Sequence, residues 1–396
     1  MVPRRLVRRL PVLVEFLHQE ATAGLVLVAA TVAALVWANS PAGDAYASFW
    51  HQELTIGHGS WAVTEDLQHW INDGLMAVFF FVVGLEIKRE LVVGELTERR
   101  AAVLPVVAAL GGVLLPALIY LVVAPSGPAG QGWGVPMATD IAFAVGILAL
   151  FSARAGTGAK LLLLSIAIVD DIIAIVVIAA FYSGPVKWSW LGLAVLGLLV
   201  TAMMARLVSS PWAYVPLALV IWFAVLESGI HATIAGVALG LMTPAHPVRG
   251  RPVLEELEHL LHPVSAYVVI PLFALANAGI DLRGGVLGEA AGERLTWAVA
   301  LGLIVGKTIG IGTAALGARR FGVGELPSGM PPAQVWPVAA LGGIGFTVAL
   351  FITDLAFTDP VLIIQAKVGI FAGSLAAAAL GAALLFTVSR RQARVQ

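Results

Sequence analysis

The sequence predicts an all-α integral membrane protein with twelve transmembrane helices. Of its 396 residues, 59% are hydrophobic and only 12% are charged, whereas soluble domains are about a quarter charged. Several apolar segments reach the roughly 20 residues that a helix needs to cross about 30 Å of hydrocarbon, and none shows the alternation of an outer-membrane barrel strand. The spans are therefore expected to be helical.

Twelve apolar segments can be counted along the chain. They are centred on residues 21–38, 70–86, 101–123, 133–151, 161–182, 189–205, 212–226, 230–243, 264–280, 295–316, 334–353 and 361–387. No linker or soluble insert separates them, so residues 1–396 are expected to form a single membrane domain. The longest polar connection, 243–263, carries three glutamates and three histidines.

The positive charges alternate between the connections. Eighteen of the 23 lysines and arginines fall in the N-terminus, in every second connection and in the tail, three fall in the opposite connections, and Lys307 and Lys367 fall inside spans. By the positive-inside rule both termini are cytoplasmic. The basic start lacks the short hydrophobic core and cleavage site of a signal peptide, so it is expected to be a retained amphipathic segment. Lys367 is expected to snorkel outward.

The chain contains no cysteine, which excludes disulfides, thiolate metal sites, iron–sulfur clusters and cysteine nucleophiles. Its net charge of −1 says little about partners, and no nucleic-acid partner is expected. The partner that the composition predicts is the lipid bilayer.

Two adjacent aspartates, Asp170 and Asp171, interrupt the apolar run "SIAIVDDIIAIVVIAAF". An ionisable residue near the bilayer centre costs at least about 2.5 to 3.5 kcal/mol, so each needs a partner, a cavity or a bound ion. Counting at about 1.5 Å per residue from the cytoplasmic side places Asp170, Asp140, Lys307 and the "GGIGFT" stretch all about 15 to 18 Å deep. An alternative is that the carboxylates only pair with Lys307 to hold helices together, which leaves two of them without a partner.

Adjacent helical residues differ by about 100° around the axis, so only one of Asp170 and Asp171 is expected to face a central cavity. Three carboxylates in a low-dielectric site do not all ionise cheaply, so the site is expected to hold either protons or a cation. Hard monovalent cations favour oxygen ligands, which the carboxylates and the Thr139 hydroxyl supply.

Two spans look interrupted at this depth. "VPMATDIAFAVG" has Pro136 and the polar Thr139–Asp140 step, and "ALGGIGFTVAL" has Gly342, Gly343 and Gly345. Non-helical backbone at that depth is tolerated only beside a cavity or inside protein. Asp140 is expected to offset the half-helix ends of the fourth span and Lys307 those of the eleventh. The alternative for the eleventh span is that its glycines serve only close packing.

The broken spans are the middle members of two triplets, spans 3–5 and 10–12, which run in opposite directions. The fold is therefore expected to contain inverted-topology repeats with discontinuous helices at spans 4 and 11.

Eight motifs resemble the NhaA-type Na+/H+ antiporter family, in order and over nearly the whole chain. They are "WINDGLMAVFFFVVGLEIKREL", "MATDIAFAVGIL", "AIVDDIIAI", "ESGIHATIAGV", "LEHLLHP", "PLFALANAGI", "VGKTIGI" and "LGGIGFTVALFI". Inverted repeats are themselves a feature of NhaA-type transporters, so the repeat argument and the resemblance are not independent. The chain departs from the family at two positions. Many members have glycine two residues after the aspartate pair, where this chain has Ile173, and many have proline after the lysine of the tenth span, where this chain has Thr308. The curvature of these two helices is therefore not implied by the resemblance.

The resemblance implies roles for individual residues. Asp170 and Asp171 would bind Na+, with Asp171 the main ligand, and Thr139 and Asp140 would form the unwound part of the fourth span. Lys307 would be the lysine of the tenth span. The remaining implied positions are Glu86, Arg89 and Glu258 for pH sensing at the cytoplasmic funnel and Asp73 as an acidic position of the outer half.

Four residues allow a less specific interpretation. Glu86 and Arg89 have the alternative of simple solvated helix ends, and His259 and His262 the alternative of solvated loop histidines. Asp73 and Glu86 lie about 20 Å apart along a helix, so they are not expected to share one site.

The sequence therefore predicts electrogenic, pH-regulated exchange of cytoplasmic Na+ or Li+ for more than one external proton by alternating access. It predicts no enzyme activity and no cofactor. The resemblance implies a bacterial cytoplasmic membrane and a homodimer, for which the outer connection "WHQELTIGHGSW" is a candidate contact. The rivals are a channel, an intramembrane hydrolase, for which the usual motifs are missing, and a proton-coupled transporter of another monovalent cation or a small organic substrate.

Overall fold

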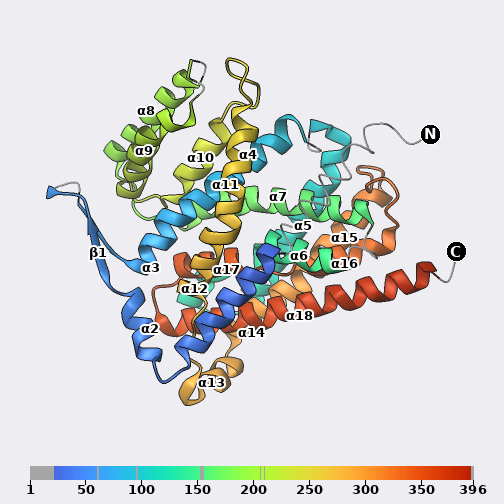
Figure 1. Ribbon diagram of the computed structural model, residues 1–396. Helices are drawn as coiled ribbons and strands as arrows, with labels where there is room; N and C mark the ends of the chain where they lie inside the picture. Colours follow the sequence, from blue (N-terminus) through green and yellow to red (C-terminus); the bar gives the residue numbers. More distant parts are fainter. Residues whose placement is uncertain are drawn as a thin grey trace. The chain divides into compact units, whose positions relative to one another are not determined.

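The computed structural model describes residues 22–59, 62–94, 97–151, 156–205, 207–208 and 210–393 (Figure 1). The predicted amphipathic start, residues 1–21, lies outside them. Within the described residues, six helices are long and apolar enough to cross a membrane, or up to nine if three bent helix pairs are each counted as one span. Three further apolar helices of 10 to 17 residues are shorter. The structure therefore agrees with a helical membrane protein.

The chain divides into two compact units. The first comprises residues 1–29, 99–170 and 287–396, and the second comprises residues 30–98 and 171–286. One long helix, α7 (Thr157–Phe181), runs from the first unit into the second.

The first unit contains two helices that are broken near their middle. The chain bends by 40° between the 3-10 helix η4 (Pro128–Met137) and α6 (Ile141–Leu150). It bends by 47° between the segments Pro332–Leu341 and Phe346–Ala356. The second pair consists of α16 (Val335–Leu341, after the short turn η9, Pro332–Gln334) and α17 (Phe346–Ala356). The other helices of this unit are α5 (Arg99–Val123), α13 (Val286–Gly292), α14 (Arg294–Leu301), α15 (Lys307–Arg320) and α18 (Pro360–Ala393).

Glycines bring α5 and α15 into close contact. A Cβ atom built on Gly310 would lie 2.2 Å from the carbonyl oxygen of Gly111, and one built on Gly111 would lie 2.3 Å from that of Gly310. Because lipid supplies no hydrophobic driving force between spans, such close backbone approach is the main source of helix association.

The helix Thr22–Ala38 begins in residues of the first unit and ends in residues of the second, which holds the remaining elements. These are the helix α2 (Gly43–Trp50), the strands β1 (Glu53–Ile56) and β2 (Val63–Asp66), the helices α3 (Leu67–His69), α4 (Met76–Val92), α8 (Trp188–Met204), α9 (Val215–Glu227, after the turn η5, Pro211–Tyr214), α10 (Thr233–Met242), α11 (Val253–Val264) and α12 (Ile270–Asn277), and the short turn η7 (Arg283–Gly285).

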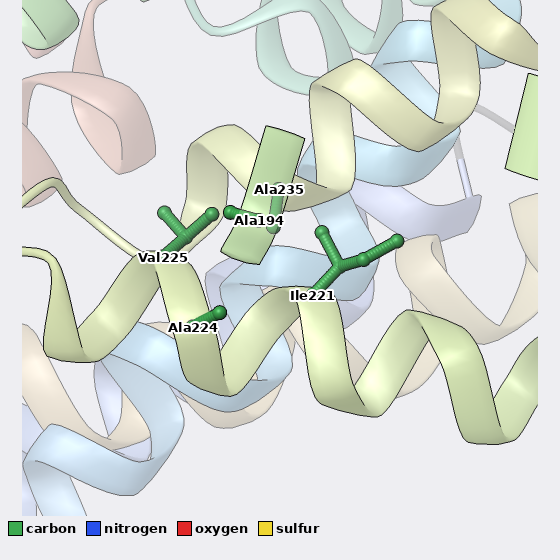
Figure 2. Close-up of a cluster of buried hydrophobic side chains, with 5 residues drawn as sticks. All are labelled: Ala194, Ile221, Ala224, Val225 and Ala235. Carbon is green, nitrogen blue, oxygen red and sulfur yellow. The ribbon is translucent and has the colours of Figure 1, made fainter. Parts of the chain in front are cut away.

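Small buried side chains join α8, α9 and α10. Ala194 of α8, Ile221, Ala224 and Val225 of α9 and Ala235 of α10 form one buried cluster (Figure 2). Alanines at the contact let these short helices pack tightly, as the glycines do between α5 and α15.

The sequence predicted no strand, and in this it was incomplete. β1 and β2 pair antiparallel, with Glu53 opposite Asp66 and Ile56 opposite Val63. β-branched residues fill the two pairs nearest the turn, Thr55–Thr64 and Ile56–Val63. Gly57 and Gly59 adopt positive φ at the turn end of β1, a conformation that glycine adopts without a Cβ penalty.

The connection 243–263 was predicted to be the longest polar connection, and in the structure its second half is helical. α11 starts at Val253 and continues through a π-helical turn, η6 (Ser265–Val269), into α12, so that Val253–Asn277 forms one helix of 25 residues with an apolar 18-residue window. Val253 and Leu254 are buried. The glutamates hid an apolar face repeating every three to four residues.

Two other π-helical turns lie within the described helices. η2 (Trp70–Leu75) opens the helix that continues as α4, and η8 (Gly302–Gly306) joins α14 to α15 immediately before Lys307. π-helical turns occur mostly as single-turn bulges and often near functional residues.

The contact between α5 and α15 can be tested with Gly310→Ala, because the new methyl group would meet the backbone of Gly111. We expect the change to destabilise the protein by about 1 to 3 kcal/mol and to lower the thermal unfolding midpoint measured in detergent. The matched control is Gly317→Ala on the same helix, where a Cβ meets nothing within 4 Å. Equal midpoints for the two variants would contradict the assigned contact.

Candidate functional site

A buried ion pair connects two helices of the first unit. Lys307 opens α15 and Asp170 lies on α7, and both side chains are fully buried. The Lys307 ammonium donates to Oδ2 of Asp170 at 2.7 Å. The other oxygen of this carboxylate, Oδ1, is buried and accepts no hydrogen bond from any residue that the structure describes. One oxygen of Asp170 is thus neutralised and the other keeps its acceptor capacity.

Thr139 connects this ion pair to both broken helices. Its hydroxyl accepts a hydrogen bond from the Lys307 ammonium at 3.0 Å and donates one to the carbonyl oxygen of Gly342 at 2.8 Å. Thr139 lies in the break between η4 and α6, and Gly342 in the break between α16 and α17. The two interruptions predicted from sequence therefore meet in space.

Asp140 caps two half-helices at once. Its Oδ1 accepts from the backbone N–H of Phe143, in the first turn of α6, at 3.0 Å. Its Oδ2 accepts from the backbone N–H and the hydroxyl of Thr347, at the start of α17, at 3.0 and 2.6 Å. A carboxylate is favourable at the partly positive N-terminus of a helix, and here one carboxylate serves two such ends.

The crossing is close because its backbone carries no side chains at the critical points. A Cβ atom on Gly343 would lie 2.4 Å from the carbonyl oxygen of Leu303. The backbone N–H of Asp140 donates to the carbonyl oxygen of Ile344 at 2.6 Å. Gly345 directly precedes α17, and a Cβ atom built on it would lie 3.0 Å from the carbonyl oxygen of Ala138. The glycines thus allow backbone-to-backbone contact at the breaks.

The structure places Lys307 against Asp170 and Thr139, whereas the sequence predicted that it offsets the half-helix ends of the eleventh span. Asp140 contacts those ends directly at Thr347. Asp171, the next residue of α7, is also buried, at 5% exposure. Asp170, Lys307, Thr139, Asp140 and the three glycines accordingly gather in the first unit.

The predicted pH-sensing residues pair within the second unit. Arg89 of α4 and Glu258 of α11 form an ion pair. Glu86, on the same helix as Arg89, lies with one carboxylate oxygen 3.8 Å from Nε2 of His262. Both His262 and Glu258 belong to α11, and not to a loop as the sequence indicated.

Asp73 lies in the π-helical turn η2, and its backbone carbonyl accepts a hydrogen bond from the indole N–H of Trp222 at 2.8 Å. This turn is at the opposite end of the α4 helix from Glu86 and Arg89. As predicted, Asp73 and Glu86 do not share a site.

Sequence reasoning missed Thr347 and misjudged Lys367. Thr347 was visible as the second residue of the half-helix that follows the glycine-rich break, where an unpaired N–H requires an acceptor. Lys367 was expected to snorkel, but it is 7% exposed and its ammonium lies 3.3 Å from a carboxylate oxygen of Asp354. Asp354, near the end of α17, was not considered as its partner.

A family model described as Na+/H+ antiporter 1 matches residues 14–385. The chain belongs to this family. It is 44% identical to "Na(+)/H(+) antiporter NhaA 3" of Frankia alni over 422 residues, which cover 98% of this chain and 91% of that protein. It is 42% identical to "Na(+)/H(+) antiporter NhaA" of Janthinobacterium sp. (strain Marseille) over 429 residues, with 97% and 95% covered.

A third relative, "Na(+)/H(+) antiporter NhaA 2" of Erythrobacter litoralis, is 46% identical over 373 residues, which cover 94% of this chain and 92% of that protein. The family resemblance stated from the motifs is thus confirmed. Membership in the Na+/H+ antiporter 1 family makes the chain a multi-pass membrane protein of a transporter family and not an enzyme.

The buried ion pair can be tested with Lys307→Met, which leaves Asp170 as an uncompensated buried charge. We expect a loss of about 3 to 5 kcal/mol of stability, visible as a lower thermal unfolding midpoint in detergent. The double variant Asp170→Asn/Lys307→Met should recover most of this loss.

Lys187→Met is the matched control, because Lys187 pairs with Glu227 at an exposed position. Exposed pairs contribute about 1 kcal/mol or less. If Lys307→Met unfolded at the wild-type midpoint, Lys307 would not balance a buried charge.

Proposed function

We propose that the chain exchanges Na+ or Li+ for protons across a bacterial cytoplasmic membrane, and that Asp170 and Asp171 carry both. The observation that carries this proposal is the Asp170 carboxylate, which is fully buried, paired through one oxygen and without a hydrogen-bond donor among the described residues at the other. A buried oxygen with spare acceptor capacity suits a hard monovalent cation or a proton. The family membership supports the choice of Na+.

Na+ and protons compete for the same carboxylate oxygens, and this competition couples their movements into an exchange. Na+ and protons require the same carboxylate oxygens, so the site holds one or the other and never both. Inward proton flow then drives Na+ out of the cell, and excess acid stops transport by keeping the carboxylates protonated. If more than one proton exchanges for each Na+, the membrane potential contributes about 2.3 kcal/mol per net charge per 100 mV.

The two broken helices give the site its oxygen-rich surroundings. The Thr139 hydroxyl accepts a hydrogen bond from the Lys307 ammonium and passes the contact on by donating to the Gly342 carbonyl. Asp140 stabilises the N-terminal ends of both half-helices, so these ends stay inside the membrane without other counter-charge. We assign Thr139 and Asp140 to the ion path and Lys307 to charge balance.

The helix inventory supports twelve spans. The six long helices, the three bent pairs and the three shorter apolar helices together give that number. With twelve spans both termini are cytoplasmic, and the triplets of spans 3–5 and 10–12 become inverted repeats around the two broken helices. We propose one transport domain over residues 1–396, working by alternating access.

We propose a homodimer in which the β1–β2 hairpin provides a contact. Every residue of β1 is exposed, with Leu54 and Ile56 at 42% and 52%, and β2 is partly exposed. Exposed edges of a two-stranded sheet favour pairing with another strand.

The deciding experiment is proton release from everted vesicles with a preset pH gradient, on addition of Na+, Li+, K+ or choline. We expect a response to Na+ or Li+ for the wild type and none for Asp170→Asn/Asp171→Asn at an equal amount of protein in the membrane. Glu289→Gln, an exposed carboxylate on α13, is the matched control and should behave as wild type.

Cation-dependent proton release that survives in the double variant would refute the assigned ligands. A response only to K+, or only to an organic solute, would instead favour the rival transporter. Flux without a counter-ion requirement would favour a channel.

The pH-sensing assignment can be tested with Glu258→Gln, which removes the ion-pair partner of Arg89. We expect the pH profile of Na+-driven proton release to shift with little loss of maximal rate. Glu256→Gln, two residues earlier on α11 and paired with Arg251 at an exposed position, is expected to leave the profile unchanged. An unshifted profile for Glu258→Gln would remove this residue from the regulation.

A further inference from the structure

The short half-helix α17 is held at both ends by α18. At its start, the backbone N–H of Gly345 donates to the hydroxyl oxygen of Ser374 at 3.3 Å. Near its end, the carboxylate of Asp354 lies 3.3 Å from the Lys367 ammonium. Ser374 and Lys367 both belong to α18 and are 6% and 7% exposed.

The spacing of these groups matches two antiparallel helices. Lys367 and Ser374 are seven residues apart, which places them on one face of α18 about 10.5 Å apart along its axis. The earlier residue of α18 meets the later part of α17, and the later residue meets its start. α18 therefore fixes the height of α17 along the helix axis at two points.

The Lys367–Asp354 ion pair fixes the axial position of α17 against α18, which apolar packing alone would leave free to slide. Every residue from Phe346 to Thr353 is buried, and apolar side chains between antiparallel helices do not define one axial position strongly. Asp354 near the C-terminal end of α17 is unfavourable against the helix dipole, so its position there requires a cation such as Lys367. The contacts of Ser374 and Lys367 thus position α17 although they require polar and charged groups to be buried, which apolar packing would not require.

The start of α17 is also where Thr347 donates two hydrogen bonds to Asp140. α17 has 11 residues and is about 16 Å long, and a helix of this length moves as one body. A displacement of its axis would therefore change the geometry at Asp140, next to Thr139 and the ion pair.

We propose that Ser374 and Lys367 are positioning residues of the transport site: they hold α17 at the height at which Thr347 meets Asp140. This inference rests on the ion site proposed above. Neither side chain is assigned contact with the transported ion, and both act through α17.

The test measures the KM for Na+, the maximal rate and the pH profile of proton release in everted vesicles. Ser374→Ala is expected to raise the KM by roughly two- to tenfold, the range that one lost hydrogen bond allows, and to shift the pH profile with the maximal rate kept. Ser374→Thr, which retains the hydroxyl oxygen, is expected to restore the wild-type KM.

Thr353→Val is the matched control. Thr353 is as buried as Ser374 and lies on α17, but among the described residues its hydroxyl donates only to the carbonyl of Ala349 in its own helix. We expect its KM and pH profile to stay at the wild-type values. A drop in unfolding temperature for Ser374→Ala with an unchanged KM and pH profile would show a purely structural role and overturn the proposal.

The ion pair provides an independent arm. Lys367→Met is expected to raise the KM and shift the pH profile, and the exchanged pair Asp354→Lys/Lys367→Asp is expected to reverse both changes. A wild-type KM in Lys367→Met would overturn the role of Lys367. Because Asp170→Asn/Asp171→Asn is measured in the same assay, loss of the proposed ion site is told apart from loss of the positioning role.

Discussion

The carboxylate of Asp140 accepts hydrogen bonds from the first turns of both α6 and α17, and the arrangement of the first unit depends on this one group. A helix end inside a membrane leaves backbone N–H groups that neither lipid nor water can satisfy. One carboxylate shared by two ends satisfies several of them and balances both helix dipoles. The two half-helices are thereby tied to the same atom pair, and neither can change its position without affecting the other. The glycines at 342, 343 and 345 follow from this arrangement, because only backbone without side chains allows the breaks to approach so closely.

The ion pair of Lys307 and Asp170, unlike Asp140, gives little evidence of supporting the fold. Replacing a buried ion pair by apolar groups is often neutral or stabilising, so such a pair is weak evidence for a stabilising role. Here the pair is also incomplete, since only Oδ2 of Asp170 is engaged by the ammonium. A fully satisfied pair would make a better support for the fold and a poorer place to receive a cation. The unequal use of the two oxygens therefore supports the proposed transport site more than a purely structural role.

Much of this arrangement could be predicted because charge inside an apolar segment is expensive. Asp140, Asp170 and Lys307 stood out by their calculated depth, and Pro136 and the glycines indicated the breaks. Other features gave weaker signals. The pairing of Lys367 with Asp354 depends on how α17 and α18 pack, which residue spacing along one chain does not reveal. The glutamates of α11 made its apolar face hard to recognise in the sequence. The hairpin 53–66 lies in a connection without alternating hydrophobic residues, so its two short strands were not predicted. Thr347 was overlooked because a hydroxyl costs little in a membrane, although its backbone N–H determined its role.

The π-helical turn Gly302–Gly306 has a consequence for the length of the coding sequence. Its hydrogen bonds run from residue i to i+5, so it accommodates one residue more than an α-helical turn. Deleting any one residue there would restore regular α-helix and rotate α14 by about 100° relative to Lys307. The buried face of α14, which includes Leu295, Ala298 and Val299, would then no longer match its neighbours while Lys307 stays against Asp170. Single-codon deletions in this helix should therefore be selected against, and an alignment with a relative one residue shorter should place its gap within these five positions.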